Sequence, residues 1–303
     1  MTKVSQPIQA LFRRGLSGAL LALLVMLAAS LAVRAESVLD RIERTGVFNA
    51  GARIDAVPFG YRDQKGQLTG FSVDLIREIH RRLEQRLDRP LKLRLHEITP
   101  ANRMEWVING TIDIECGVTT PTWSREAQVD FSIPFFGNGA RVMTLQNAID
   151  QLQDLKGKRI GVAAGTTTAD ILAEHVPEAI PVEVPDMATG FEQFRRGELD
   201  GLANIGIVLR AMVEGSPLKS KVILLPRSGM FSYETMACIL PQNDSAWRDL
   251  VNRTLAELLA GVDEYRGAYM EIYERWFGPR GVVYFPLDYA TAQRLAASII
   301  WLR

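Results

Sequence analysis

The stretch from Asn102 to Phe136 (NRMEWVINGTIDIECGVTTPTWSREAQVDFSIPFF) most constrains how this 303-residue chain can fold. Its apolar positions predict a short amphipathic helix, a turn at Asn109-Gly110 and a buried strand from Thr111 to Gly117. A polar loop with a Thr-Thr-Pro cluster follows, and a second apolar run ends at Phe136. The stretch therefore predicts one helix followed by two buried strands.

Two arginines, Arg103 and Arg125, flank the predicted strand. Guanidinium groups give forked, bidentate hydrogen bonds to carboxylates, so a pair that points into one crevice can clamp an anion. Two solvated surface arginines are the alternative, because arginine side chains are mostly exposed. The spacing alone leaves both interpretations open.

The first 35 residues have the pattern of an export signal. Basic residues precede an apolar run from Leu16 to Val33, and Val33-Arg34-Ala35 fits a small-x-small cleavage site before Glu36. The run is also long enough to act as a membrane anchor. Because small residues stand where the peptidase needs them, and because this segment has no cysteine for lipid attachment, we expect cleavage near Ala35 and a free periplasmic protein.

Charge and histidine content exclude several kinds of partner. The chain has 35 Lys and Arg against 35 Asp and Glu, which gives no reason to expect nucleic acid as a partner. The histidines, His80, His96 and His175, are scattered singly, and no C-x-x-C motif occurs. We therefore expect no metal and no cofactor.

Cys116 and Cys238 are the only two cysteines. In an oxidising compartment an even pair is a disulfide candidate. Both lie in apolar, strand-like runs (TIDIECG and ETMACIL), so two buried free thiols are the alternative.

Several separate motifs occur in the order typical of one family. They are Gly-Phe-Ser-Val-Asp-Leu at 70–75, Asn-Arg at 102–103, Asn-Gly-Thr-x-Asp-x-Glu-Cys-Gly at 109–117, Thr-Thr at 119–120, Arg-Glu at 125–126 and Phe-Ser at 131–132. From about Val38 to Pro279 the chain resembles the periplasmic solute-binding proteins for polar amino acids (bacterial extracellular solute-binding proteins, family 3). The resemblance is greatest to their glutamate/aspartate-binding branch.

The resemblance implies an α/β fold of the type II periplasmic binding protein class. Two lobes, each a mixed sheet flanked by helices, are joined in this fold by two crossover strands. We expect residues 36–137 with 231–303 to form lobe 1, and residues 138–230 to form lobe 2. The strands of Cys116 and Cys238 are neighbours in such a fold, which favours a disulfide between them.

Further along the chain, apolar runs predict the crossovers and the second lobe. Phe131 to Thr144 suits a crossover strand, and its Gly-Asn-Gly interruption suits a hinge. Gly201 to Leu209 predicts a buried strand and turn, and Ser245 to Phe277 predicts helix broken near two glycines. Pro286 to Leu302 predicts one more helix, docked on lobe 1.

By resemblance, three arginines bind the two ends of an acidic ligand. Arg125 binds the α-carboxylate and Thr120 adds a hydroxyl bond, while Arg53 and Arg103 contact the side-chain carboxylate. Arg53 directly follows a predicted strand, and strand ends are where open α/β sheets place ligand groups. Pro100-Ala101-Asn102 stands where many relatives stack an aromatic side chain, which favours a charged ligand side chain.

A turn in lobe 2, Gly165 to Thr168, precedes a predicted helix. A helix start exposes N–H groups that suit a carboxylate, although capping by threonine explains the same residues. The lysine of a phosphate loop is missing. The resemblance assigns Thr166 and Thr167 to the ligand, and it places Met187 and Val118 at positions where the resembled branch has histidine and serine.

The position of Ile205 is the main departure from the family. An aspartate that pairs with the ligand ammonium usually stands there, and Asn204 just before it is the nearest polar residue. A buried ammonium without an anionic partner is costly. Either Asn204, backbone carbonyls or an acid elsewhere in the cleft (Glu115 or Asp186) substitutes, or the ligand carries no α-ammonium.

The resemblance implies a monomeric receptor that closes over glutamate or aspartate and delivers it to an inner-membrane ABC permease. Repulsion among the three guanidinium groups is expected to keep the unliganded cleft open. A receptor for an amine-free dicarboxylate is one alternative. A periplasmic dehydratase-type enzyme on the same fold is another, and it needs a proton donor such as Glu115 or Asp186. A sensory domain that reports to a membrane kinase is a third.

Overall fold

A computed structural model describes residues 36–299. The compact unit that begins at Val38 is described by itself below. The predicted export signal, and the end of the helix predicted from Pro286 to Leu302, lie outside the described residues. Within the described range, every helix is too short or too polar to span a bilayer.

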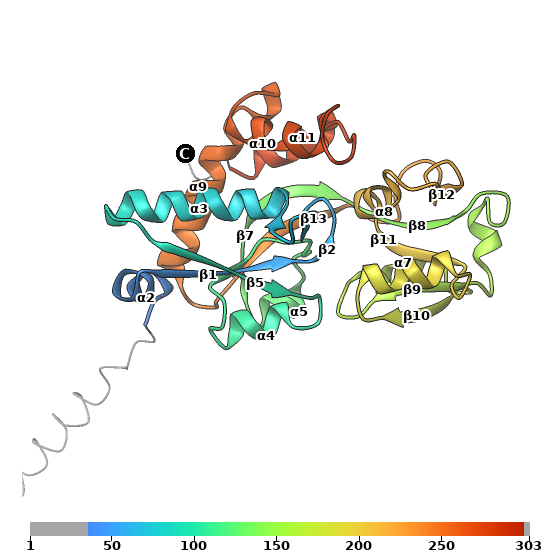
Figure 1. Cartoon of the computed structure of the whole chain (residues 1–303), viewed down its shortest axis with the longest axis horizontal. Coiled ribbons are helices and arrows are strands. Elements are labelled where there is room, and N and C mark those ends of the chain that lie inside the picture. Colours follow the sequence, from blue (N-terminus) through green and yellow to red (C-terminus); the bar gives the residue numbers. More distant parts are fainter. Residues whose placement is uncertain (1–35, 300–303) are drawn as a thin grey trace, which may run out of the picture. The chain divides into compact units, whose positions relative to one another are not determined.

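Two five-stranded mixed sheets organise this unit (Figure 1). The first has the strand order β5-β1-β6-β13-β7, the second has the order β10-β9-β11-β8-β12, and β2-β3-β4 form a small third sheet. The strands are β1 (Val47–Arg53), β2 (Asp55–Ala56), β3 (Gly60–Arg62), β4 (Leu68–Thr69), β5 (Lys92–Ile98), β6 (Ile114–Glu115), β7 (Asp130–Asn138), β8 (Ala140–Leu145), β9 (Arg159–Ala163), β10 (Ile180–Val184), β11 (Gly201–Ile205), β12 (Val222–Leu225) and β13 (Glu234–Leu240). We call the bodies built on the first and second sheets lobe 1 and lobe 2.

Helices flank both sheets. Lobe 1 carries α2 (Val38–Thr45), α3 (Phe71–Leu87), α4 (Arg103–Ile108), α5 (Trp123–Glu126), α9 (Ser245–Leu259), the 3-10 turn η2 (Val262–Glu264), α10 (Ala268–Phe277) and α11 (Tyr289–Ala297). Lobe 2 carries the 3-10 turn η1 (Leu152–Leu155), α6 (Thr168–His175), α7 (Met187–Arg195) and α8 (Gly206–Val213). The two-lobed α/β architecture agrees with the fold class expected from the sequence.

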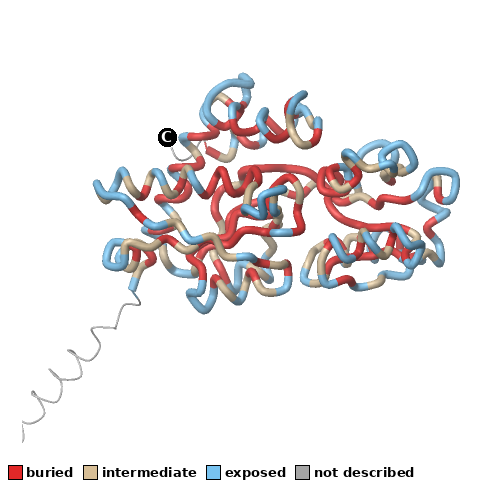
Figure 2. The backbone as a smooth tube through the Cα atoms, in the orientation of Figure 1, coloured by how far each residue is buried: buried red, intermediate tan, exposed pale blue. Residues whose placement is uncertain are grey.

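Aromatic side chains fill the core of lobe 1. Phe71 at the start of α3 packs against Phe59, Phe136 and Phe277, with the Phe59 and Phe136 rings 4.9 Å apart and nearly perpendicular. Such edge-to-face pairs add to the free energy of burying the rings. Figure 2 shows the buried backbone running along the strands of both lobes, with exposed segments at the loops and outer helix turns.

A disulfide joins Cys116 to Cys238, as the sequence analysis expected. Strands β6 and β13 are antiparallel and pair Glu115 with Ile239, so the two cysteines stand opposite one another with Cα atoms 4.1 Å apart. Both side chains are fully buried. The crosslink ties the end of β6, within the first sheet, to β13, the strand by which the chain returns to lobe 1.

Two predicted strands differ from the structure. Only Ile114–Glu115 of the predicted strand from Thr111 to Gly117 is β6. Just before it, Asp113 donates its backbone N–H to the Asn49 carbonyl and accepts the Asn49 N–H on its carboxylate. A strand and turn were predicted from Gly201 to Leu209. The strand ends at Ile205, and helix α8 begins at the next residue, Gly206. A continuous apolar run does not distinguish a buried strand from a buried helix, which explains the second error.

Two glycines allow the crossover strands to approach each other. The first crossover runs from β7 through Gly139 into β8, and the second returns from β12 to β13. A Cβ atom at Gly139 would lie 1.7 Å from the Ser232 carbonyl oxygen, and one at Gly137 would lie 2.1 Å from the Tyr233 hydroxyl. The sequence suggested that these glycines supply flexibility; the structure shows that their small size is needed for close packing.

We expect Gly139→Ala to lower the melting temperature. The added methyl group would meet backbone rather than a movable side chain, and overpacking of this kind costs about 1–3 kcal/mol. For a domain of this size that corresponds to a fall of roughly 3–10 °C in differential scanning fluorimetry. Gly190→Ala in α7 is the control, because the nearest atoms to its added methyl group are side-chain methyls that can shift. A Gly139 variant as stable as the wild type would contradict the close packing of the crossovers.

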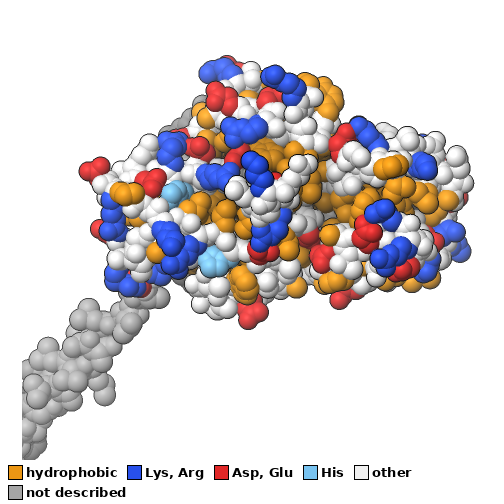
Figure 3. Space-filling view, in the orientation of Figure 1, with side chains coloured by type: hydrophobic (Ala, Val, Ile, Leu, Met, Phe, Trp, Pro, Cys, Tyr) orange, Lys and Arg blue, Asp and Glu red, His pale blue; other side chains and the backbone are white. Residues whose placement is uncertain are grey.

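Charged side chains of both signs are interspersed on the face shown in Figure 3. Many form exposed ion pairs, such as Arg81 with Glu78 on α3 and Arg82 with Glu257 between α3 and α9. Exposed pairs of this kind contribute little to stability because water and salt screen them. The charged face of α3 is therefore solvated surface.

Candidate functional site

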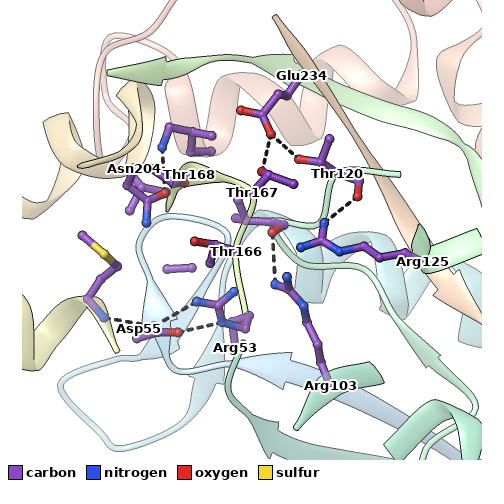
Figure 4. A pocket seen from close by; sticks show the side chains of 15 residues that line it. Arg53, Asp55, Arg103, Thr120, Arg125, Thr166, Thr167, Thr168, Asn204 and Glu234 are labelled. Atoms are coloured by element: carbon purple, nitrogen blue, oxygen red, sulfur yellow. Dashed lines mark hydrogen bonds and ion pairs between the residues drawn. The ribbon is translucent and has the colours of Figure 1, made fainter. Parts of the chain in front are cut away.

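All eight residues predicted to bind a ligand line one cavity between the lobes (Figure 4). They are Arg53, Arg103, Thr120, Arg125, Thr166, Thr167, Met187 and Asn204. The cavity volume is about 20 Å³, which is room for about one water molecule. A larger molecule therefore needs more room than this arrangement of the lobes provides.

Arg53, the last residue of β1, forms a buried ion pair with Asp55 at the start of β2. Its Nε and Nη2 atoms donate to the two carboxylate oxygens at 2.7 and 2.9 Å. Across the cleft, the backbone N–H of Met187 also donates to Asp55 Oδ2 at 3.3 Å. Burial opposes ionisation of Asp55, but attraction and hydrogen bonds from Arg53 outweigh it and lower the pKa of the carboxyl.

This ion pair corrects one expectation. The sequence suggested three mutually repelling guanidinium groups that keep the empty cleft open, whereas Asp55 neutralises the charge of Arg53. Arg103 is still repelled by Arg53 and Arg125, and the attraction of Glu115 and Asp55 opposes that repulsion.

Arg103 is the first residue of α4 and is 1% exposed. Its Nη1 donates to the Val118 carbonyl at 3.2 Å and its Nη2 to the Gly165 carbonyl of lobe 2 at 3.3 Å. Its Nε has no hydrogen-bond partner in the structure. Burial lowers the pKa of Arg103 to about 9, against the attraction of Glu115. The group is still a cation at neutral pH, with one donor unused.

Arg125 lies on α5, which the hydroxyl of Thr122 caps by accepting the Arg125 backbone N–H. Its Nη1 donates to the Thr120 carbonyl at 2.6 Å, and its Nη2 donates across the cleft to the Gly165 carbonyl at 3.1 Å. Burial lowers the pKa of Arg125, and the negative charge of Glu234 opposes that effect. One carbonyl of lobe 2 thus accepts from two guanidinium groups of lobe 1, an arrangement that a full carboxylate charge would satisfy better.

Glu234, the first residue of β13, extends into the cavity opposite the arginines (Figure 4). Its Oε2 accepts from the hydroxyls of Thr120 at 2.6 Å and Thr167 at 2.7 Å, and its Oε1 accepts from Ser232 at 3.0 Å. Thr120 belongs to lobe 1 and Thr167 to lobe 2. The hydroxyls that the resemblance assigned to a ligand therefore bind a resident carboxylate in this structure.

The threonine turn before α6 is not a capping arrangement. Thr167 is the N-cap residue of α6 but makes no side-chain capping bond. The Thr166 hydroxyl donates to the Ala163 carbonyl at 2.8 Å. The turn therefore leaves the hydroxyl of Thr167 free to reach the cavity, where it meets Glu234.

The acids suggested from the sequence as ammonium partners are not at the cavity. Glu115 is fully buried behind it, where one carboxylate oxygen accepts from the Thr119 hydroxyl at 3.0 Å. Asp186 is a half-buried N-cap that accepts the Thr189 backbone N–H at 2.7 Å. Asn204 does line the cavity, but its Oδ1 accepts the backbone N–H of Ile205 at 2.7 Å.

Sequence reasoning missed two carboxylates that line the cavity, Asp55 and Glu234. Each had a detectable signal. Asp55 stands two residues after Arg53 at the end of a strand, and Glu234 is an acid at the start of the apolar run YETMACIL. With them, three guanidinium groups and two carboxylates line the cavity, which leaves one excess positive charge.

Comparison with known proteins identifies the family. The bacterial extracellular solute-binding proteins, family 3, match residues 48–279. This chain belongs to that family. The L-glutamate/L-aspartate-binding protein of Pseudomonas aeruginosa is 31% identical to it over 265 residues, which cover 82% of this chain and 84% of the relative. The glutamate/aspartate import solute-binding protein of Salmonella typhimurium is 31% identical over 252 residues, 80% of each chain.

Solved structures support the same assignment. An ancestral arginine-binding protein bound to glutamine superposes with a TM-score of 0.68 at 26% identity, and the match covers 77% of this chain and 98% of that protein. The family and the fold class expected from the motifs are thus confirmed.

This family member has a helix beyond the matched range. The match ends at residue 279, whereas α11 begins at Tyr289. The Arg294 guanidinium on α11 lies 3.9 Å from the centre of the Tyr233 ring, and the Tyr233 hydroxyl donates to the Thr291 hydroxyl at 3.4 Å. The added helix is therefore held against the residue that precedes Glu234.

Proposed function

We propose that this chain is the periplasmic solute-binding component of an ABC importer and that it binds glutamate or aspartate between its lobes. The observation that carries the proposal is the meeting of Arg53, Arg103 and Arg125 with a helix-start turn of lobe 2 in one cavity. Relatives named as glutamate- and aspartate-binding proteins support it. In this proposal residues 1–35 are removed on export and the mature chain acts as a monomer.

The charges of the side chains that line the cavity match an acidic amino acid in number and in sign; Glu115 acts on Arg103 and Arg125 from behind the lining and is not in this count. Glutamate and aspartate carry two carboxylates and one ammonium, a net charge of −1, and the cavity lining carries one excess positive charge. A dicarboxylate without an amine would leave one lining carboxylate without a cation. Since unpaired charge is costly when closure excludes water, the balance favours the amino acid.

Ligand binding would replace the contacts that now join the lobes. The Gly165 carbonyl accepts from Arg103 and Arg125, and Thr167 donates to Glu234. Hydrogen bonds to a charged carboxylate contribute about 1.5–3 kcal/mol each, against about 0.5–1.5 kcal/mol for neutral pairs. Exchange of a carbonyl for a ligand carboxylate therefore favours the liganded closed form, which the permease would recognise.

An enzyme on the same fold would need a proton donor at the bound molecule. The residues suggested for that role, Glu115 and Asp186, do not line the cavity. Of the carboxylates that do, Asp55 is held by Arg53, and Glu234 accepts hydrogen bonds from three hydroxyls. We therefore propose binding without chemical conversion.

A ligand screen with the mature chain tests the proposed function. We expect glutamate or aspartate at about 100 times its Kd to stabilise the protein by about 2.7 kcal/mol, a rise of roughly 5–10 °C in melting temperature. Lysine and leucine should change it little, because neither supplies a second carboxylate to the arginines. The ligand should be recovered unchanged after incubation. Absence of stabilisation by both acidic amino acids would contradict the proposal, and conversion of the ligand would favour the dehydratase alternative.

A further inference from the structure

Glu234 is a buried carboxylate whose hydrogen bonds all come from neutral groups. The residue is 7% exposed, and its partners are the hydroxyls of Thr120, Thr167 and Ser232. Within residues 36–299, no ion pair includes it. Hydroxyl donors lower the cost of burying a carboxylate but do not neutralise it. The side chain is therefore suited to receive a cation.

Asp55 differs from Glu234 in this respect, whereas Glu115 also accepts only from a neutral hydroxyl but does not line the cavity. Asp55 has both oxygens bound to Arg53. Glu115 lies behind the lining and is fully buried. Of the carboxylates that line the cavity in the described chain, Glu234 is thus the one that accepts no hydrogen bond from a guanidinium group, although its charge attracts Arg125.

Thr120 places Glu234 beside Arg125. The Thr120 carbonyl accepts from Arg125 Nη1 at 2.6 Å, and the Thr120 hydroxyl donates to Glu234 Oε2 at 2.6 Å. Thr120 therefore contacts the Arg125 guanidinium through its carbonyl and the Glu234 carboxylate through its hydroxyl. An α-amino acid presents the complementary pair, a carboxylate and an ammonium on one carbon atom.

The positive charge of Arg103 suits the side-chain carboxylate of such a ligand. Arg103 is a buried cation at the cavity with an unused Nε donor. If Arg125 takes the α-carboxylate, Arg103 is left for a side-chain carboxylate. Strand β11 supplies no acid here, since Asn204 and Ile205 are its lining residues.

We infer that Glu234 holds the ligand ammonium and makes the site select acidic α-amino acids over the amine-free diacids of the same length. This inference deepens the proposed function and rests on it. It also explains how a cavity without an acid on β11 can bind an amino acid: the carboxylate enters from β13, the strand that returns to lobe 1.

Calorimetric titration of L-glutamate and of glutarate, the same diacid without the amine, tests the inference. The wild type is expected to bind glutamate at least tenfold more tightly than glutarate. Glu234→Gln keeps an oxygen that accepts from the threonine hydroxyls but removes the charge. We expect it to weaken glutamate binding at least tenfold and to leave glutarate binding unchanged or stronger. Asp55→Asn, the matched variant at the other lining carboxylate, should change both affinities together.

The ratio of the two affinities separates an ammonium contact from a structural role. If Glu234→Gln weakens both ligands equally, Glu234 only supports closure and the inference is overturned. Unchanged glutamate binding in Glu234→Gln, or collapse of the ratio in Asp55→Asn instead, also overturns it. A wild type that binds glutamate and glutarate equally would refute the ammonium contact while leaving an acid receptor in place. A wild type that binds no acidic amino acid would refute the proposed function itself, and the inference with it.

Discussion

Replacement of Arg125 by alanine is expected to weaken binding of glutamate and aspartate by at least about 30-fold. Arg125 reaches from α5 to the Gly165 turn of lobe 2, and it is the guanidinium group next to Thr120 and Glu234. Removing one partner of a buried, hydrogen-bonded charge pair costs about 2–5 kcal/mol, because the other charge is left unpaired. That loss corresponds to roughly 30- to several-thousand-fold in Kd, which calorimetry measures directly.

Two further variants make this result specific. Arg125→Lys keeps the charge but loses the planar fork, so we expect an intermediate loss of affinity. Arg141→Ala is the matched control: that guanidinium also donates to two backbone carbonyls, those of Leu224 and Pro226, but lies outside the cavity lining. The affinity of the Arg141→Ala variant for glutamate should stay close to that of the wild type. If Arg125→Ala binds glutamate as the wild type does, the proposed binding mode is wrong.

The predicted ligand residues converge because the fold brings the ends of distant elements to one place. Arg53 ends β1, Arg103 begins α4, and the Gly165 turn follows β9. Sequence motifs supplied these positions through a resemblance, since no local pattern in the sequence says that residues more than a hundred positions apart will meet. The structure adds what motifs cannot: Arg103 and Arg125 of lobe 1 both donate to the Gly165 carbonyl of lobe 2, and Arg103 Nε is left without a partner.

Asp55 and Glu234 show why the remainder of the site was not predicted. An acid two residues from an arginine can face the other side of a strand, and only the turn into β2 brings Asp55 back to Arg53. Glu234 is recognised as a site residue only by its hydrogen bonds to Thr120 and Thr167, which precede it by 114 and 67 residues. The charge balance of the cavity is therefore a property of tertiary structure, although each residue that sets it is visible in the sequence.

The errors in secondary structure have a related cause. Gly201 to Leu209 is apolar throughout, and only its packing decides that α8 begins at Gly206. In contrast, the glycines that interrupt the helical region from Ser245 to Phe277 were sufficient to place breaks, because Gly261 and Gly267 both have positive φ angles. A backbone conformation that requires glycine can thus be predicted from the sequence, whereas the packing that turns an apolar run into helix or strand cannot.

Replacing both cysteines by alanine is expected to lower the free energy of unfolding by about 5 kcal/mol. Cys116 and Cys238 are separated by 122 residues, a loop that contains both crossovers and all of the second sheet. A crosslink of that span removes a large amount of conformational entropy from the unfolded chain, about 4.7 kcal/mol for a 100-residue loop. The corresponding fall in melting temperature is roughly 10 °C or more, measured by differential scanning calorimetry.

A reducing agent distinguishes the effect of losing the crosslink on the melting temperature from the effect of replacing the cysteine side chains. Dithiothreitol should lower the melting temperature of the wild type toward that of the double alanine variant and should leave the variant unchanged. The single variants Cys116→Ala and Cys238→Ala should each unfold at nearly the same temperature as the double variant, because either one removes the same bond. A double variant that melts within about 2 °C of the oxidised wild type, a difference of under about 1 kcal/mol, would show that the unfolded chain gains little freedom when the crosslink is lost. The packing of β6 against β13, rather than the covalent bond, would then be what holds these two strands of the first sheet together.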